Sequence, residues 1–457
     1  MFRSLRQLTR PDRASNGSLL QYVKSNTTCR NATTHHRCFS ATSRRHIMET
    51  TGFTENQMTV REAVSTLCAK FPNSYWQEHD QNEEDPKDFH AALAKDGWLG
   101  IALPETLGGS GLGISEATMM MQTIAESGAG MAGAQSIHAN VYATQPLAKF
   151  GTLEQQQETI PRIISGEWRT CFGVTEPNTG LDTLRLRTTA RKSSDGHSYS
   201  VTGQKIWITC AQVARKMMLL ARTTPLEEVR KPSEGLSLFC IDLPDPSSRE
   251  GSGLDMRKIK KMGGRAVDAN EVFFDNYQIP ADTLVGTEDQ GFKIILHGMN
   301  AERCLLAGRL WGWVMRPWRG RLGMLGSVSC LGGLLGRIRA LRIRLLMRTC
   351  GSRPPTRLYD QSTAVEKEIA AGGDKSIGTI RQDAVGVAAN SAKYLAAEAA
   401  FTACERAVLT HGGMGYAMEY DVERWLRECL VPRIAPVSRE MIMNYIGEKV
   451  LGLPRSY

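Results

Sequence analysis

The residues of this 457-residue chain that could do acid–base chemistry centre on one glutamate. Glu302 and Arg303 stand in the segment GMNAERCLLAG, where Met299, Leu305 and Leu306 indicate a helix that faces a packed interior. Burial among such side chains would raise the pKa of the Glu302 carboxyl and make it a better general base. The alternative is a solvated helical glutamate with no role in catalysis.

A glycine-rich turn is the second candidate. Gly412-Gly413-Met414-Gly415 follows a long helical run. Because glycine has no Cβ to keep a ligand away, this turn could bring backbone amides close to a phosphate or an adenine. We expect the adjacent His411 to support the turn rather than to act as a base. The chain has no GxGxxG motif in a strand–helix–strand unit, which disfavours a Rossmann dinucleotide fold.

Three successive segments that differ in their hydrophobic periodicity must position these residues. Helical periodicity dominates residues 53–165, short alternating segments fill residues 166–285, and a helical pattern returns over residues 286–457. We therefore predict a multidomain α and β protein, with an N-terminal helical domain, a middle antiparallel β-domain and a C-terminal helical bundle.

The net charge of +9 does not indicate a nucleic-acid surface, because the positive charge is confined to two segments. Residues 1–45 carry +8 and residues 309–357 carry +11, which leaves −10 for the rest of the chain. That sign is wrong for binding a duplex. No window of about 18 apolar residues predicts a membrane span. The 11 cysteines form no CxxC pair or Cys/His grouping, so we expect no metal site and a reducing compartment.

The first basic segment has the composition of a mitochondrial presequence. Residues 1–45 are rich in Arg, Ser and Thr, contain one acid and lack a long apolar stretch, and RCFS at residues 37–40 resembles a cleavage site. We expect a transit peptide over residues 1–45 and a location in the mitochondrial matrix. A retained basic tail and a peroxisomal location are the alternatives, although RSY at residues 455–457 is no peroxisomal signal.

The second basic segment, residues 309–357, departs from the rest of the chain in composition. It contains three of the chain's eight Trp, and it also contains eight Gly. Its only charged residue type is Arg, and its apolar residues do not fall on one face of a helix. Arg, Gly, Leu, Trp, Cys and Pro together are what GC-rich coding sequence yields out of frame. We therefore interpret the segment as a frameshift or a mis-spliced gene model; a basic helix that binds a membrane or partner and a real insertion are the alternatives.

Four local signatures occur in the order of the three segments of different periodicity. They are PETLGGSGLG (104–113), VTEPNTGLD (174–182), GQKIWIT (203–209) and HGGMGYAMEYDVERWLRE (411–428). As a set they make the chain resemble the acyl-CoA dehydrogenase family over roughly residues 57–308 and 358–457. The resemblance implies FAD-dependent α,β-dehydrogenation of an acyl-CoA thioester, transfer of the electrons to an electron-transfer flavoprotein, and a homotetramer. An acyl-CoA oxidase and a non-catalytic flavoprotein relic are the alternatives.

The resemblance also implies roles at two strand ends. Val174 and Thr175 would hydrogen-bond the isoalloxazine ring, Trp207 would pack on it, and Thr209 would lie close to its N5 atom. Without the resemblance, Trp207 is an alternating strand residue and Thr175 a turn former.

Glu302 is the base that the resemblance implies. Many family members carry a catalytic Glu in an Ile-Tyr-Glu-Gly-Thr motif, where this chain has Pro436, which cannot take a proton. Isovaleryl and long-chain members place the Glu just before an Arg, as in Glu302-Arg303, and Arg303 would then orient the base and contact the substrate. Glu419 and Glu440 are less favoured candidates.

Other positions concern FAD binding between subunits. By resemblance, Gly412 and Gly413 would reach the flavin of a neighbouring subunit. However, Leu181 replaces a Ser that would meet the pyrophosphate, Leu409 replaces a Gln, and residues 309–357 lack the Arg and the Phe-Gly motif that contact FAD across the dimer. We therefore expect this polypeptide, as written, to bind FAD poorly and to tetramerise poorly.

Overall fold

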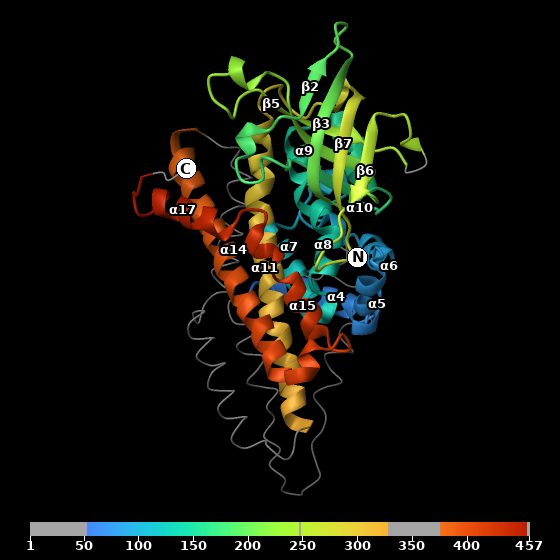
Figure 1. The fold of residues 1–457 in the computed structure, drawn as a ribbon, viewed down its shortest axis with the longest axis vertical. Coiled ribbons are helices and arrows are strands. Elements are labelled where there is room, and N and C mark those ends of the chain that lie inside the picture. The colour runs from blue at the N-terminus through green and yellow to red at the C-terminus, as the bar shows by residue number, and fades with distance from the viewer. Residues whose placement is uncertain (1–52, 246–247, 328–374, 455–457) are drawn as a thin grey trace, which may run out of the picture. The chain divides into compact units, whose positions relative to one another are not determined.

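The computed structural model describes residues 53–245, 248–327 and 375–454. All elements below belong to the unit Glu55–Tyr457, in which a group of helices, a β-sheet and a second group of helices follow one another (Figure 1). The predicted fold class is thereby confirmed. The predicted transit peptide, residues 1–45, lies outside the described residues.

In the first helical group, α7 and α8 are almost wholly buried. The group comprises α4 (Glu55–Cys68), α5 (Asn73–Asn82), α6 (Lys87–Lys95), α7 (Ile114–Ile124), α8 (Gly130–Tyr142), α9 (Thr144–Phe150) and α10 (Leu153–Ile164). A π-helical turn separates α7 from α8, and Gly128 (φ 112°) and Gly130 (φ 62°) lie there in conformations that side chains with a Cβ rarely adopt. This break lets α8 lie against both the sheet and the C-terminal helices.

A seven-stranded sheet forms the middle of the unit. Its strands are β1 (Thr170–Gly173), β2 (Thr189–Lys192), β3 (Ser198–Thr209), β4 (Lys216–Arg222), β5 (Leu236–Asp242), β6 (Leu254–Lys258) and β7 (Ala269–Pro280). The order is β1-β4-β2-β3-β7-β6, and β5 also pairs with β4. Along β3 the side chains alternate, so that Tyr199 and Val201 enter the core while Thr202 is exposed.

The sequence analysis predicted an antiparallel β-domain, but the sheet is mixed. β1 pairs in parallel with β4, with Thr170 opposite Lys216, while β3, β7 and β6 pair in the antiparallel sense. The β2–β3 hairpin lies between β1 and β4 in the sequence, and it supplies the crossover that a parallel pair requires.

The second helical group is built on two long helices that lie side by side (Figure 1). It comprises α11 (Gly291–Ser327), α14 (Lys375–His411), α15 (Asp421–Glu428), α16 (Val431–Ile434) and α17 (Arg439–Lys449). Small residues of α14 such as Ala400 let Leu306 and Leu310 of α11 pack closely against it. α11 continues to Ser327, so the first part of the segment 309–357 is helical, and residues 328–357 lie outside the described part. None of the helices in the described ranges is long and apolar enough to cross a membrane.

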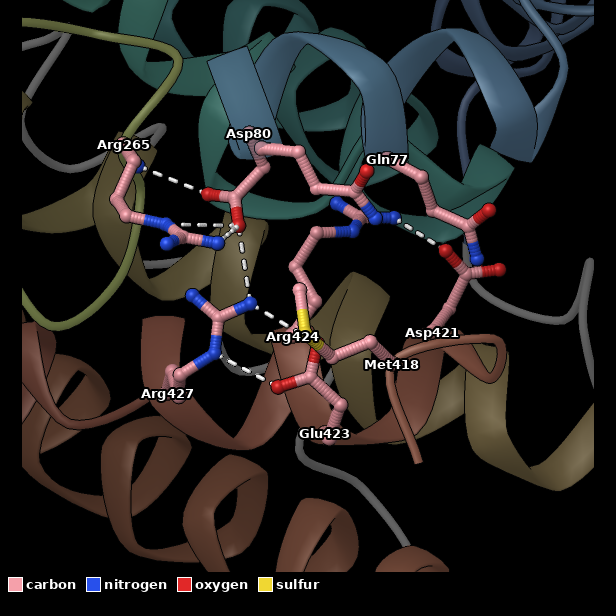
Figure 2. A pocket seen from close by; sticks show the side chains of 9 residues that line it. Gln77, Asp80, Arg265, Met418, Asp421, Glu423, Arg424 and Arg427 are labelled. Carbon is pink, nitrogen blue, oxygen red and sulfur yellow. Dashed lines mark hydrogen bonds and ion pairs between the residues drawn. The ribbon is translucent and has the colours of Figure 1, made fainter. Parts of the chain in front are cut away.

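One buried carboxylate joins all three groups of elements. Asp80 of α5 accepts hydrogen bonds from the amide and guanidinium of Arg265, at 2.9 Å and 2.8 Å, and from Arg427 Nη2 of α15 at 2.9 Å (Figure 2). Arg427 also pairs with Glu423 at 2.7 Å. Burial opposes ionisation of Asp80, but the two arginines outweigh it and lower the pKa below its ordinary value. The pocket in Figure 2 is thus lined by paired charges, and we interpret these charges as a structural contact that connects α5, the segment of Arg265 and α15.

Candidate active site

The two strand ends that the sequence analysis singled out lie side by side. The Ile206 amide donates a hydrogen bond to the Thr175 carbonyl at 2.9 Å, which joins the segment after β1 to the end of β3. Val174 is buried, whereas Thr175 and Thr209 are partly exposed and Trp207 is exposed. The structure therefore brings these four predicted residues together.

A buried ion pair locks this junction, and the sequence analysis did not identify it. Lys205 Nζ donates to Glu176 Oε1 at 2.9 Å and to the Val174 carbonyl at 3.1 Å. Glu176 also accepts hydrogen bonds from the amides of Arg187 and Thr188, at 2.7 Å and 2.9 Å. Burial opposes ionisation of Glu176, but the Lys205 charge and these donors outweigh it and lower its pKa. Alternation along β3 directs Lys205 inward with Tyr199 and Val201, so a Lys at an inward position was a signal that could have revealed a buried partner, although not that the partner is Glu176.

Trp207 lies in a strained conformation at the end of β3. The register between β3 and β7 shifts between Lys205 and Ile208, and Trp207 within this bulge has φ 62°. Bulky residues avoid the left-handed region, so such an outlier is characteristic of functional positions. Its side chain is 56% exposed. An exposed indole on a locked strand end offers a face for a flat aromatic ring, and this observation fits an isoalloxazine.

One face of α8 contacts both strand ends. Gln135, His138 and Tyr142 share this face because they are spaced by three and four residues. The Tyr142 ring packs against Phe172 of β1 with centroids 5.4 Å apart, and His138 packs against Tyr142 at 4.9 Å. Gln135 Nε2 donates to Thr209 Oγ1 at 3.3 Å. The helical spacing could have revealed this face, but not which element it would contact.

Glu302 lies on α11, close to the same face of α8. Burial raises the pKa of its carboxyl to about 7, although Arg303, Arg309 and Lys393 oppose the rise. The pKa of Tyr142 is raised by burial and by the charge of Glu302, so these two side chains are electrostatic neighbours. A carboxyl with a pKa near neutral is well matched to removing a proton from carbon.

Two further cations surround Glu302. Arg303 Nη1 donates to Asn300 Oδ1 at 2.7 Å, and its Nε has no hydrogen-bond partner in the described part of the chain. Lys393 of α14, which is 1% exposed, donates to the Val437 carbonyl at 2.5 Å. Val437 follows Pro436, the position at which the resemblance would have a catalytic Glu. The C-terminal segment and Glu302 thus approach the same cluster, and Lys393 is a member that the sequence analysis missed.

Arg309 is the most unusual charge in the site. Its side chain is 1% exposed, and its Nη2 donates to Gln135 Oε1 at 2.7 Å and contacts Met131 Sδ. Its Nη1 lies 2.5 Å from His138 Nδ1. No carboxylate of the described residues forms an ion pair with it, and burial lowers its pKa to about 9. Arg309 opens the segment 309–357, whose composition gave no sign of a role in the site.

The structure does not bring the predicted glycine turn to the strand ends. Gly412 and Gly413 follow α14 in the 3₁₀ turn η8 (Gly412–Tyr416) and are exposed, and a Cβ at either would meet no atom within 4 Å. Among the described residues, no hydrogen bond links them to the strand ends. His411 Nδ1 donates to the Ala407 carbonyl at 2.8 Å, which suits the predicted turn-supporting role.

Comparison with known proteins agrees with this arrangement. Models of the acyl-CoA dehydrogenase N-terminal, middle and C-terminal domains match residues 54–167, 171–277 and 366–451. An acyl-CoA dehydrogenase of Mycobacterium tuberculosis is 30% identical over 415 residues, which are 88% of this chain and 98% of that protein. The chain belongs to the acyl-CoA dehydrogenase family. It is therefore an FAD-dependent oxidoreductase of the acyl-CoA dehydrogenase type.

Two other similarities extend over most of the chain. A mitochondrial isovaleryl-CoA dehydrogenase of Pongo abelii is 26% identical over 87% of this chain and 89% of that protein. The structure of an acyl-CoA dehydrogenase from Geobacillus kaustophilus has a TM-score of 0.73 at 25% identity, covering 88% of this chain and 99% of the other. Glu302 lies between the middle-domain and C-terminal matches, so its role rests on the geometry described above.

Proposed function

We propose that this acyl-CoA dehydrogenase removes the α-proton of an acyl-CoA thioester with Glu302 as the base. The observation that carries the proposal is the Glu302 carboxyl, whose pKa burial raises to about 7, on a helix that meets the exposed strand ends through α8. FAD, when bound, supplies the acceptor for the hydride that leaves Cβ. The reaction needs a base and a hydride acceptor on opposite sides of the Cα–Cβ bond, and the site offers a carboxylate and a ring platform on separate elements.

The residues of the chain would divide the work as follows. Val174, Thr175, Trp207 and Thr209 would hold the flavin ring at the locked strand ends. Glu302 would take the α-proton, and a substrate that expels water would strengthen it as a base. The positive charges of the neighbouring cations would stabilise negative charge as it develops on the thioester. Of these cations, Arg303 would lie closest to the base along the chain and would contact the substrate.

We further propose that the reduced enzyme passes its electrons to an electron-transfer flavoprotein and acts in fatty-acid or branched-chain amino-acid catabolism in the mitochondrial matrix. The exposed turn at Gly412 and Gly413 has room for a ligand or a second subunit. This supports the proposal that the protein works as a homo-oligomer, with the turn reaching the flavin of a neighbouring subunit.

Anaerobic reduction of the bound flavin tests the reaction. The full chain, supplied with excess FAD, is mixed with acyl-CoA thioesters of different chain length and branching, and the visible flavin band is followed. At least one thioester should bleach the band, and Glu302→Gln should abolish bleaching without loss of FAD binding. Glu419→Gln is the matched control, because Glu419 is exposed and outside the site. Bound FAD that no acyl-CoA reduces would refute the proposal, and release of peroxide in air would indicate an oxidase instead.

A further inference from the structure

Three side chains from different elements form a continuous hydrogen-bond chain across the site. Arg309 of α11 donates to Gln135 Oε1 at 2.7 Å, and Gln135 Nε2 of α8 donates to Thr209 Oγ1 of β3 at 3.3 Å. Gln135 thus links the helix that carries Glu302 to the strand end that carries Trp207.

The direction of every hydrogen bond in this chain follows from the chemistry of its groups. A guanidinium has donors only, so the group that faces Arg309 must be the carbonyl oxygen of the Gln135 amide. The NH₂ group of Gln135 then faces Thr209, whose hydroxyl oxygen must accept. A hydroxyl has one proton, and that proton is directed away from Gln135. Because Thr209 is partly exposed, its proton remains available to a group outside the protein core.

We propose that Gln135 and Arg309 are positioning residues that hold the Thr209 hydroxyl as a hydrogen-bond donor to the flavin ring. The inference rests on the proposed function, in which Thr209 lies close to N5. A donor held in place stabilises negative charge that the ring gains on reduction, because it needs no reorientation at that moment. The buried positive charge of Arg309 polarises the Gln135 amide and so strengthens the hydrogen bond that Gln135 donates to Thr209, which means that this effect also acts through the Thr209 hydroxyl.

The same contacts predict a difference between two replacements of Gln135. Leucine removes both the acceptor for Arg309 and the donor to Thr209, and the hydroxyl becomes free to rotate. Glutamate keeps the acceptor for Arg309, but its ionised carboxylate accepts from Thr209 and draws the hydroxyl proton away from the flavin. Gln135→Glu should therefore impair the flavin site more than Gln135→Leu, although glutamate is closer to glutamine in shape.

Gln145 provides a matched control on the next helix. It is also partly exposed, and its Nε2 donates to the carbonyls of Ala102 and Val141, each at 3.3 Å. No hydrogen bond in the described part of the chain connects it with Thr209. Gln145→Leu removes a glutamine of similar exposure from the same helical layer, so it reports a purely structural loss.

The test measures FAD affinity, the visible spectrum and the reduction potential of the full chain with FAD. Gln135→Leu and Thr209→Val should each weaken FAD binding about 3- to 10-fold, shift the visible band and lower the potential. In a double-mutant cycle, Gln135→Leu should cost nothing further in the Thr209→Val background. Gln145→Leu should keep the spectrum and potential of the unmodified protein. If Gln135→Leu does not fold, Gln135→Met fills the site with an unbranched side chain and serves in its place.

The outcomes separate this inference from the proposed function. Additive effects of the Gln135 and Thr209 replacements, or an unchanged spectrum and potential in Gln135→Leu, would overturn the positioning role while acyl-CoA still bleached the flavin. An unmodified chain that binds no FAD at any concentration would overturn both. Loss of affinity without any change in spectrum or potential would also overturn it, because a merely structural glutamine would produce that result.

Discussion

Replacing Glu302 by Gln should move catalysis and stability in opposite directions. The amide is close in shape to the carboxyl but cannot take a proton, so turnover should fall by about 10²- to 10⁴-fold, the usual contribution of a general base. FAD binding should not change, because the predicted ring contacts are on β3 and after β1. Turnover close to that of the unmodified protein would refute Glu302 as the base.

The stability effect follows from the pKa of Glu302, which burial raises from 4.5 to about 7. Below the ordinary value, the carboxyl is protonated in both folded and unfolded chains, and it contributes no pH-dependent free energy. Between the two values only the unfolded chain ionises, so the folded state loses stability as the pH rises, and the loss is complete above about 7. At 1.36 kcal/mol per pH unit the full penalty is about 3 kcal/mol, and partial exposure of the side chain reduces it to about 1–3 kcal/mol.

Denaturant unfolding at two pH values measures this effect. At about pH 8 the midpoint of Glu302→Gln should exceed that of the unmodified protein by an amount worth about 1–3 kcal/mol, and at about pH 4 the two midpoints should coincide. Glu419→Gln should change neither midpoint nor turnover, because Glu419 is exposed. An equal gain at both pH values would show that the stabilisation comes from packing and not from the buried charge.

Three further predictions concern charge and cofactor. Arg309→Met removes a buried cation that lowers the pKa of Glu302, so the rise of kcat/KM with pH should shift to a midpoint above about 7. The stability of this variant should be unchanged or raised by about 1–4 kcal/mol. A shift of the kcat/KM midpoint to lower pH would contradict this prediction. Asp80→Asn should lower stability at neutral pH by about 1–3 kcal/mol, because the ionised carboxylate is the partner of the two arginines. Thermal melts should show that this difference disappears as the pH falls through the lowered pKa of Asp80. The unmodified chain should bind FAD weakly in fluorescence titration and run below tetramer size in gel filtration; tight yellow tetramer on purification would contradict the expected effect of residues 309–357.

Much of the fold was predictable because it depends on local periodicity. Helical spacing and strand alternation place the three groups of elements, and apolar neighbours such as Leu305 and Leu306 predict that α11 is packed against the interior. The motif residues Thr175, Trp207 and Thr209 were found through the resemblance of their motifs to the acyl-CoA dehydrogenase family, because alternation alone would make Trp207 an ordinary strand residue and Thr175 a turn former. Their roles toward FAD remain predictions, which the spectroscopic experiments above address.

The remainder depended on register and on contacts between distant segments. Lys205 faces inward in phase with Tyr199 and Val201, but the exposure of Trp207 and the burial of Ile208 follow from the bulge between Lys205 and Ile208, which alternation along β3 does not reveal. Parallel pairing of β1 with β4 is likewise a choice of the tertiary structure. Gln135 looks like any polar residue on a helix until its hydrogen bonds to Arg309 of α11 and Thr209 of β3 are known.

Arg309 connects the unusual segment 309–357 to the chemistry of the site. It stands seven residues after Glu302 on α11, so any side chain at this position lies on the same helical face and is directed towards α8. If sequencing of the message shows a different reading frame from this codon onward, the base loses a neighbouring cation and Gln135 loses the donor that sets its orientation. The reading frame therefore affects the active site as well as the structure of the C-terminal helices. It decides at which pH Glu302 ionises and whether the Thr209 hydroxyl is held as a donor.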